Sequence, residues 1–267
     1  MLMMATLYGA AIGAVLGLTG AGGGILAVPA LVLGLHWTLP QATPVALLAV
    51  GLAAAVGAAD GLRSGLVRWR AALLMAVLGV SISPLGVLAA HHLPSTTLTV
   101  LFAAAMLASS ARLLLQSKAS VGSVELETVR KNCMLNDQTG RLQWTPRCAA
   151  TLAGIGTVSG LLTGMLGVGG GFLLVPAFRQ WTGIRMQGIV ATSLLVVALI
   201  SLGAAAGAVA SGSIVTSAGY TFIGAAMAGM ALGRLGARVV AGRTLQLGFA
   251  ILSAAVAVFM VVRAFAH

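Results

Sequence analysis

The chain has 267 residues, of which 59% are hydrophobic and 7% charged, and its mean hydropathy is +1.06. This composition excludes a soluble domain of the same length and places the chain in a lipid bilayer. The net charge of +11 does not indicate nucleic-acid binding, because the Lys and Arg residues form short clusters between apolar segments instead of one basic face with interleaved aromatic residues.

The first apolar segment, residues 2–35, is too long for a single spanning helix. As one helix it would measure about 51 Å, well over the ~30 Å hydrocarbon core. The glycines of residues 20–24 (Gly-Ala-Gly-Gly-Gly) disfavour helix, and Pro29 restrains the second part. We therefore expect two short helices that meet at the glycines. No Lys or Arg precedes Arg63, so we expect no cleavable signal peptide.

The rest of the chain alternates between apolar segments and turns. We expect three spanning helices, then the one sizeable polar linker, then a second glycine-broken segment and three more spanning helices. The first three helices are expected at 43–61, 71–90 and 97–115, and the linker at 116–147. The second broken segment is expected at 148–178, and the last three helices at 189–210, 218–236 and 245–262. The segments lack the alternating polarity of membrane β-strands, so the fold class is an all-α polytopic membrane protein.

The glycine cluster occurs twice. Residues 167–171 (Gly-Val-Gly-Gly-Gly) repeat residues 20–24 with an offset of 147, and the same offset pairs Pro29 with Pro176. Gly9, Gly13 and Gly17 also have second-half partners at this offset. A duplicated chain explains the pattern, with residues 1–115 as the first membrane repeat, 116–147 as a linker and 148–267 as the second repeat.

The distribution of positive charge predicts the orientation. Turns near residues 61–70, 112–147, 179–185 and 234–243 carry two to six Lys or Arg each, whereas the other turns carry none. Positive turns face the cytoplasm, so we expect linker 116–147 inside and both termini outside. With three full spans per half, the halves are inverted if each glycine-broken element is re-entrant. Four full spans per half would place Arg179 and Arg185 outside, which their charge disfavours.

The clustered glycines are the first candidates for a binding site. Backbone N–H groups at a helix N-terminus attract anions, and glycine leaves room for an anion to approach. The candidates are Gly22, Gly23, Gly24, Gly169, Gly170 and Gly171, with the helices opening at Ile25 and Phe172. The alternative is that these glycines only allow close helix packing, which is the role we expect for Gly9, Gly13 and Gly17.

Hydroxyl groups inside apolar segments are the second set of candidates. Thr43 and the pair Thr192 and Ser193 each open a helix after a broken element, so we expect them to occupy equivalent places and to line the same cavity with Thr19. Ser81 and Ser83 are further intramembrane hydroxyls. The alternative role is helix capping or a hydrogen bond to a carbonyl in the preceding turn.

The remaining polar residues indicate neither catalysis nor a metal site. Asp60 precedes Arg63 by three residues, so we expect a structural ion pair between them, with a proton relay as the alternative. Three of the four histidines, His36, His91 and His92, fall in turns and should be solvated. Cys133 and Cys148 have no metal-ligand spacing and are expected to be free thiols. Paired carboxylates and nucleophile–base pairs are missing, so we expect no enzyme, cofactor or metal.

The two glycine segments, LTGAGGGILAVPAL and GMLGVGGGFLLVPAF, together with ATSLL at 191–195 and the two-half layout, resemble the TauE/SafE family of sulfite and organosulfonate exporters. The resemblance implies a bacterial inner-membrane permease that moves a small anion, a sulfur oxyanion or sulfonate, by alternating access. The lipid bilayer is the other partner, and the oligomeric state stays open. The alternatives are a passive anion channel and a membrane scaffold without transport activity.

Overall fold

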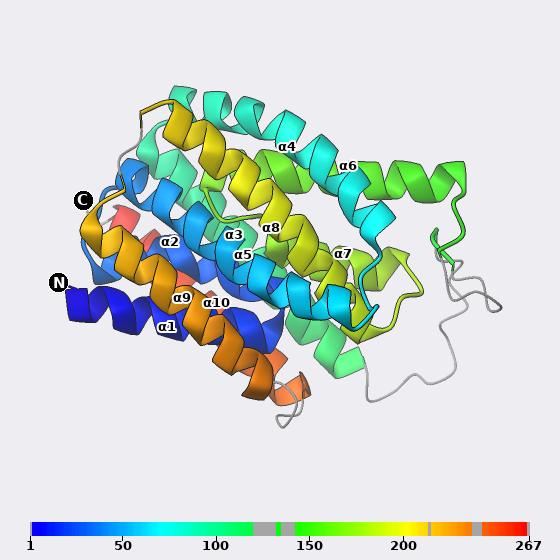
Figure 1. Ribbon diagram of the computed structural model, residues 1–267. Helices are drawn as coiled ribbons and strands as arrows, with labels where there is room; N and C mark the ends of the chain where they lie inside the picture. The colour runs from blue at the N-terminus through cyan, green and yellow to red at the C-terminus, as the bar shows by residue number, and fades with distance from the viewer. Residues whose placement is uncertain (1, 120–131, 135–141, 213–214, 237–241, 266–267) are drawn as a thin grey trace.

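The computed structural model describes residues 2–119, 132–134, 142–212, 215–236 and 242–265 (Figure 1). These residues form a bundle of helices, which confirms the all-α class. The long helices are α1 (Leu2–Thr19), α3 (Leu39–Arg63), α4 (Trp69–His92), α5 (Ser95–Ala119), α6 (Pro146–Leu166), α8 (Met186–Ala210), α9 (Ser217–Gly236) and α10 (Gly242–Phe265). Among the described helices, α1, α3, α4, α6 and α8 are long and apolar enough to cross a membrane.

Shorter elements follow each glycine cluster. After α1 come a 3₁₀ turn, η1 (Ala21–Leu26), the three-residue α2 (Ala27–Pro29) and a π-helical turn, η2 (Ala30–Gly34). After α6 comes α7 (Gly171–Trp181). In both segments the long helix ends at the glycines, as predicted. The first differs from the expected helix opening at Ile25, because the chain tightens into a 3₁₀ turn already at Ala21. Up to Gly34 it then contains only the three residues of α2 as regular α-helix.

The helices run side by side between two ends of the molecule. Figure 1 shows the start of α1 and the end of α10 at the left end, and the start of α6 at the right. The right end also carries the connections α3–α4 and α7–α8, and the first of these contacts α8 through a hydrogen bond between Arg68 and Thr192. We call this the arginine-rich end, because its turns and adjoining helix termini hold Arg63, Arg68, Arg70, Arg147, Arg179, Arg185 and Arg234.

Two helix pairs pack closely through glycine. Gly9, Gly13 and Gly17 place α1 against the backbone of α9 at Phe222, Ala226 and Met230. Gly156, Gly160 and Gly164 place α6 against α4 at Met75, Gly79 and Ser83. A side chain at any of these glycines would meet a backbone atom at less than van der Waals distance. The predicted packing role of Gly9, Gly13 and Gly17 is therefore confirmed.

Adding the repeat offset of 147 to residue numbers in the first part of the chain gives the corresponding contacts and helix boundaries in the second part. Adding 147 to Gly9 and Met75 gives Gly156 and Phe222, so the α1–α9 contacts correspond one by one to the α6–α4 contacts. The same addition converts the bounds of α3 (Leu39–Arg63) into those of α8 (Met186–Ala210). In the two predicted repeats, the first helix of each repeat therefore packs against the third long helix of the other repeat.

The cysteines depart from expectation. Cys133 and Cys148 form a disulfide with 4.9 Å between their Cα atoms, so the prediction of free thiols was wrong. The Cys133 N–H donates to the carbonyl of Trp181 at 3.1 Å, and the Gly183 N–H donates to the carbonyl of Cys133 at 3.0 Å. Residues 132–134 thus lie beside the end of α7 and are tied to the start of α6. This neighbourhood brings the thiols together, and their spacing of 15 residues did not reveal it.

Candidate functional site

The two glycine segments meet at the middle of the bundle. A Cβ atom at Gly24 would lie 3.3 Å from the carbonyl oxygen of Val168 and 2.9 Å from a methyl group of Val50. A Cβ atom at Gly169 would lie 3.2 Å from the same valine and 3.3 Å from Val197. Val50 and Val197 lie one residue before the midpoints of the 25-residue helices α3 and α8. We call the surroundings of Gly24, Val50, Gly169 and Val197 the central junction.

Next to the central junction, the first glycine segment contacts α8 and the second glycine segment contacts α3. Gly167 faces Thr43 of α3, and Gly20 faces Val190 of α8. These two contacts correspond through the offset of 147, so the counterpart of Thr43 is Val190. The expected equivalence of Thr43 with Thr192 and Ser193 was therefore wrong, because it matched similar residue types two or three positions out of register.

The second glycine segment has the more specialised backbone. Gly167, Gly169 and Gly170 have φ angles of 68°, 73° and 59°, which side chains rarely adopt. Gly170 caps the N-terminus of α7, and its carbonyl accepts a hydrogen bond from the Ser159 hydroxyl at 3.3 Å. The first N–H groups of an α-helix lack intrahelical partners. The start of α7 at Gly171 therefore provides donors and a positive dipole end beside the central junction.

The glycines of the first segment have two different roles, one in helix packing and one at the central junction. A Cβ atom at Gly23 would lie 2.5 Å from the backbone nitrogen of Leu16, so Gly23 packs η1 against α1. Gly24 faces the second segment at the central junction, and Gly22 precedes Gly23 in η1. The six-residue η1 also lacks the length of an α-helix whose dipole would attract an anion.

The predicted hydroxyls bond to nearby backbone. Thr19 donates to the carbonyl of Val15 at 2.7 Å, and Ser193 donates to that of Val190 at 3.0 Å. Thr192, which is fully buried, accepts the N–H of Arg68 at 3.0 Å and so holds the α3–α4 turn against α8. Among the other two intramembrane serines, Ser81 donates to Val77 and Ser83 is buried against α6. Of the predicted hydroxyl residues, Thr43 is the one that touches the glycine segments.

Three buried hydroxyl residues beside the second glycine segment were not predicted from the sequence. Ser159 and Thr163 of α6 adjoin Gly170, and the third is Ser201. It lies in α8 one turn beyond Val197, is fully buried, and has its Oγ against Gly169. That oxygen has no hydrogen-bond partner among the described residues. The sequence did hold a signal, because Ser201 interrupts the apolar run Leu-Leu-Val-Val-Ala-Leu-Ile in the middle of a spanning segment.

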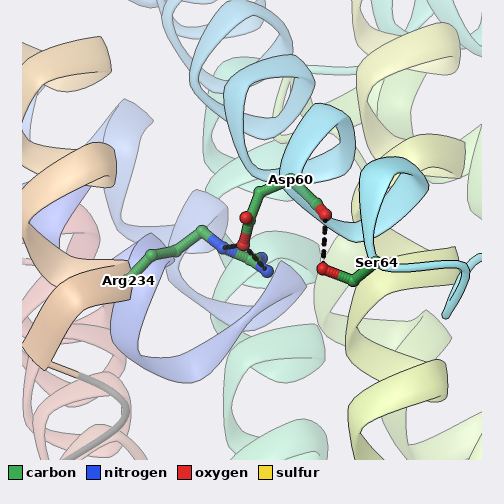
Figure 2. Close-up of polar contacts among 3 residues, drawn as sticks. All are labelled: Asp60, Ser64 and Arg234. Atoms are coloured by element: carbon green, nitrogen blue, oxygen red, sulfur yellow. Dashed lines mark hydrogen bonds and ion pairs between the residues drawn. The ribbon is translucent and has the colours of Figure 1, made fainter.

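Asp60 forms an ion pair, but with a different partner from the one predicted. Figure 2 shows its carboxylate turned toward Arg234 of α9, with Oδ2 at 2.7 Å from Nη2 and 3.0 Å from Nε. The Ser64 hydroxyl donates to the Asp60 carbonyl at 2.9 Å. The predicted pairing with Arg63 was wrong, because helix rotation aims Asp60 at α9. The pair joins α3 to α9 at the arginine-rich end.

Other candidate sites are few. His36 and His92 are exposed, as predicted, and the side chain of His91 lies outside the described residues. In the described ranges, His, Cys, Asp and Glu form no group that would hold a metal ion.

Comparison with known proteins identifies the family of the chain. The sequence model of the family described as "Sulfite exporter TauE/SafE" matches residues 5–260. A probable membrane transporter protein of Xylella fastidiosa strain 9a5c is 29% identical over 202 residues, which cover 73% of this chain and 69% of the relative. One of strain Temecula1 is 30% identical over 196 residues, with the same coverage. No solved structure matches. The chain therefore belongs to the TauE/SafE family and is a multi-pass transporter of bacterial membranes.

Proposed function

We propose that this protein is a secondary transporter that exports a small anion, sulfite or a related organosulfur anion, by alternating access. The observation that carries the proposal is the central junction, where glycine segments from both halves meet near the midpoints of α3 and α8. Broken helices that converge at mid-membrane form the substrate sites of many secondary transporters. The family described as sulfite exporters supplies the substrate class.

Alternating access requires two halves that move against each other, and we assign residues 1–115 and 148–267 to them, with 116–147 as the linker. The correspondence of helix bounds and of glycine contacts at one offset supports a duplicated architecture. The α1–α2 and α6–α7 segments are the re-entrant elements of this proposal, and they enter from opposite ends. The halves are then inverted, and the exchange of α1 and α6 between them forms the interface that rocks.

The proposed orientation follows from charge. The arginine-rich end faces the cytoplasm, together with the linker, and both termini face outward. Its arginines raise the local concentration of anions at the cytoplasmic entrance before export.

Within the proposed site, the α7 N-terminus with Gly169, Gly170 and Gly171 supplies backbone donors, while Gly22, Gly24 and Thr43 complete the opposite wall. Thr19, Thr192 and Ser193 have the backbone partners described above. We assign them to positioning of the surrounding helices, together with Gly23.

Transport by the purified protein in liposomes tests the mechanism. Sulfite efflux should accelerate when sulfite is present on the opposite side, because a carrier returns faster when loaded. A passive channel would show no such trans-stimulation. A protein that only organises other membrane proteins would show no flux at all, and either result would contradict the proposal.

A matched pair of glycine variants tests the location. Gly169→Ala should abolish or strongly reduce flux, because the new methyl group would fill the space between Val50, Val197 and Ser201. Gly65→Ala is the control, since Gly65 has a similar φ of 67° but nothing within 4 Å of the added atom. Both variants bear the strain of positive φ, about 1 kcal/mol. Equal flux in both, normalised to folded protein, would exclude the central junction as the site.

A further inference from the structure

The unpaired hydroxyl of Ser201 needs a physical explanation. Its Oγ is fully buried within α8 and finds no hydrogen-bond partner in the described part of the chain. Buried polar groups in native proteins are nearly always hydrogen-bonded, because an unmade bond is costly. Ser and Thr in membrane helices commonly donate to the preceding turn, as Ser193 of the same helix does. Ser201 instead stands against Gly169, two residues before α7 begins.

The position suits a ligand. Because Gly169 has no side chain, the Ser201 hydroxyl lies directly against the backbone of Gly169. The N-terminus of α7 follows two residues later. At the offset of 147 the first half has Ala54, so the hydroxyl belongs to one half only. A polar group without a structural partner, beside free helix donors, is what a site for an anion requires.

The surroundings limit the charge that such a site accepts. The segments forming the junction, residues 2–59, 148–178 and 186–233, contain no Asp, Glu, Lys or Arg. Backbone N–H groups and uncharged hydroxyls therefore supply all the compensation for the charge of an anion. The desolvation cost grows with the square of the charge, so a dianion costs roughly four times as much as a monoanion of the same size.

We propose that Ser201 contacts the substrate in an uncharged site that takes monovalent oxyanions, such as hydrogensulfite or an alkylsulfonate, and rejects dianions. This inference rests on the proposed function and adds to it the charge of the substrate and a specificity-determining residue.

The charge selectivity is tested with two probes of fixed charge on the purified full-length protein. Methanesulfonate, a monoanion, should raise the melting temperature, whereas sulfate at equal ionic strength should not. In proteoliposomes at constant total sulfite, flux should increase as pH falls, because the fraction of hydrogensulfite increases. Equal stabilisation by sulfate and methanesulfonate, or sulfite flux that increases with pH, would overturn the monovalent site.

The role of Ser201 is tested with Ser201→Ala. The ligand-free variant should melt at the same temperature or higher, because an unpaired buried hydroxyl is removed. Its apparent dissociation constant for methanesulfonate should increase roughly ten- to hundred-fold, the range for loss of one hydrogen bond to a charged group. Ser253→Ala is the matched control, because Ser253 of α10 is equally buried and also lacks a partner among the described residues. Its affinity should equal that of the parent.

The outcomes separate this inference from the proposed function. If the parent transports sulfite while Ser201→Ala binds and transports as well as Ser253→Ala does, the role of Ser201 is wrong and the transporter stands. If the parent neither binds these anions nor transports sulfite, both proposals fall. Should Ser201→Ala not fold, Ser201→Cys retains a weak donor of similar size and should weaken affinity by a smaller factor. Unchanged affinity in that variant would overturn the role.

Discussion

At the scale of single residues, the ion pair between Asp60 and Arg234 concerns both stability and transport. It joins the ends of α3 and α9 beside Gly17 of α1, which contacts the backbone of α9 at Arg234. The offset of 147 places Gly207 and Val87 at the corresponding positions, so the other end of the bundle has no equivalent pair there. The contact is therefore a one-sided bridge between the two proposed halves.

We expect this pair to be structural and not a proton carrier. Both side chains are partly exposed, so Asp60→Asn should cost about 1 kcal/mol or less, and a double-mutant cycle with Arg234→Gln should give a coupling energy of about 0.2–1 kcal/mol. The pH dependence of sulfite flux should persist in Asp60→Asn. If that variant loses its pH dependence while Arg234→Gln keeps it, Asp60 takes part in proton coupling instead.

At the scale of elements, the α1–α9 and α6–α4 pairs set the framework that holds the glycine segments. In a membrane, helices associate through close packing and not through the hydrophobic effect, so glycine faces have a large influence. Gly9, Gly13 and Gly17 are spaced four residues apart, and the residues of α9 that they contact, Phe222, Ala226 and Met230, have the same spacing. The position of each glycine segment is thus determined by the helix that precedes it.

Gly13→Ala should destabilise the protein by about 1–3 kcal/mol, because its methyl group would overlap the backbone of Ala226 and force the helices apart. Gly224→Ala, in the same helix pair, is the control: nothing lies within 4 Å of its added methyl group, and alanine favours helix by about 1 kcal/mol. Thermal unfolding in detergent compares the two. Equal melting temperatures would show that the glycine contact contributes little.

At the scale of the whole molecule, the arginine-rich end also contains the disulfide between Cys133 and Cys148. In the proposed orientation this end faces the cytoplasm, where disulfides are rare. We give the charge distribution more weight, because it involves seven described arginines and the disulfide a single pair of residues. The bond would then be reduced in growing cells and form under oxidising conditions.

Thiol labelling in intact cells tests this orientation. Cys133 and Cys148 should react with a membrane-permeant maleimide and not with an impermeant one. In the purified protein, reduction should remove roughly 3 kcal/mol of stabilisation from the closed 15-residue loop, so Cys133→Ser should lower the melting temperature of the oxidised form. A disulfide in cells that an impermeant reductant opens from outside would reverse the orientation.

The sequence by itself determined the membrane class, the glycine breaks and the close packing of α1. These follow from local properties: apolar length sets the spans, glycine disfavours helix, and glycine at every fourth residue forms one flat face. The repeat offset of 147 also came from sequence, and the helix bounds of α3 and α8 agree with it. Each of these features depends on residues close together in the chain.

Only the tertiary structure decided which distant groups meet. Asp60 pairs with Arg234, 174 residues away, instead of its neighbour Arg63, and Cys133 lies beside the start of α6, where it joins Cys148. Ser201 faces Gly169 because of how α8 is rotated against the second glycine segment. Rotation about a helix axis and the path of a loop depend on packing among all the helices, and for helices that are apolar on every side the sequence carries no periodic signal to specify them.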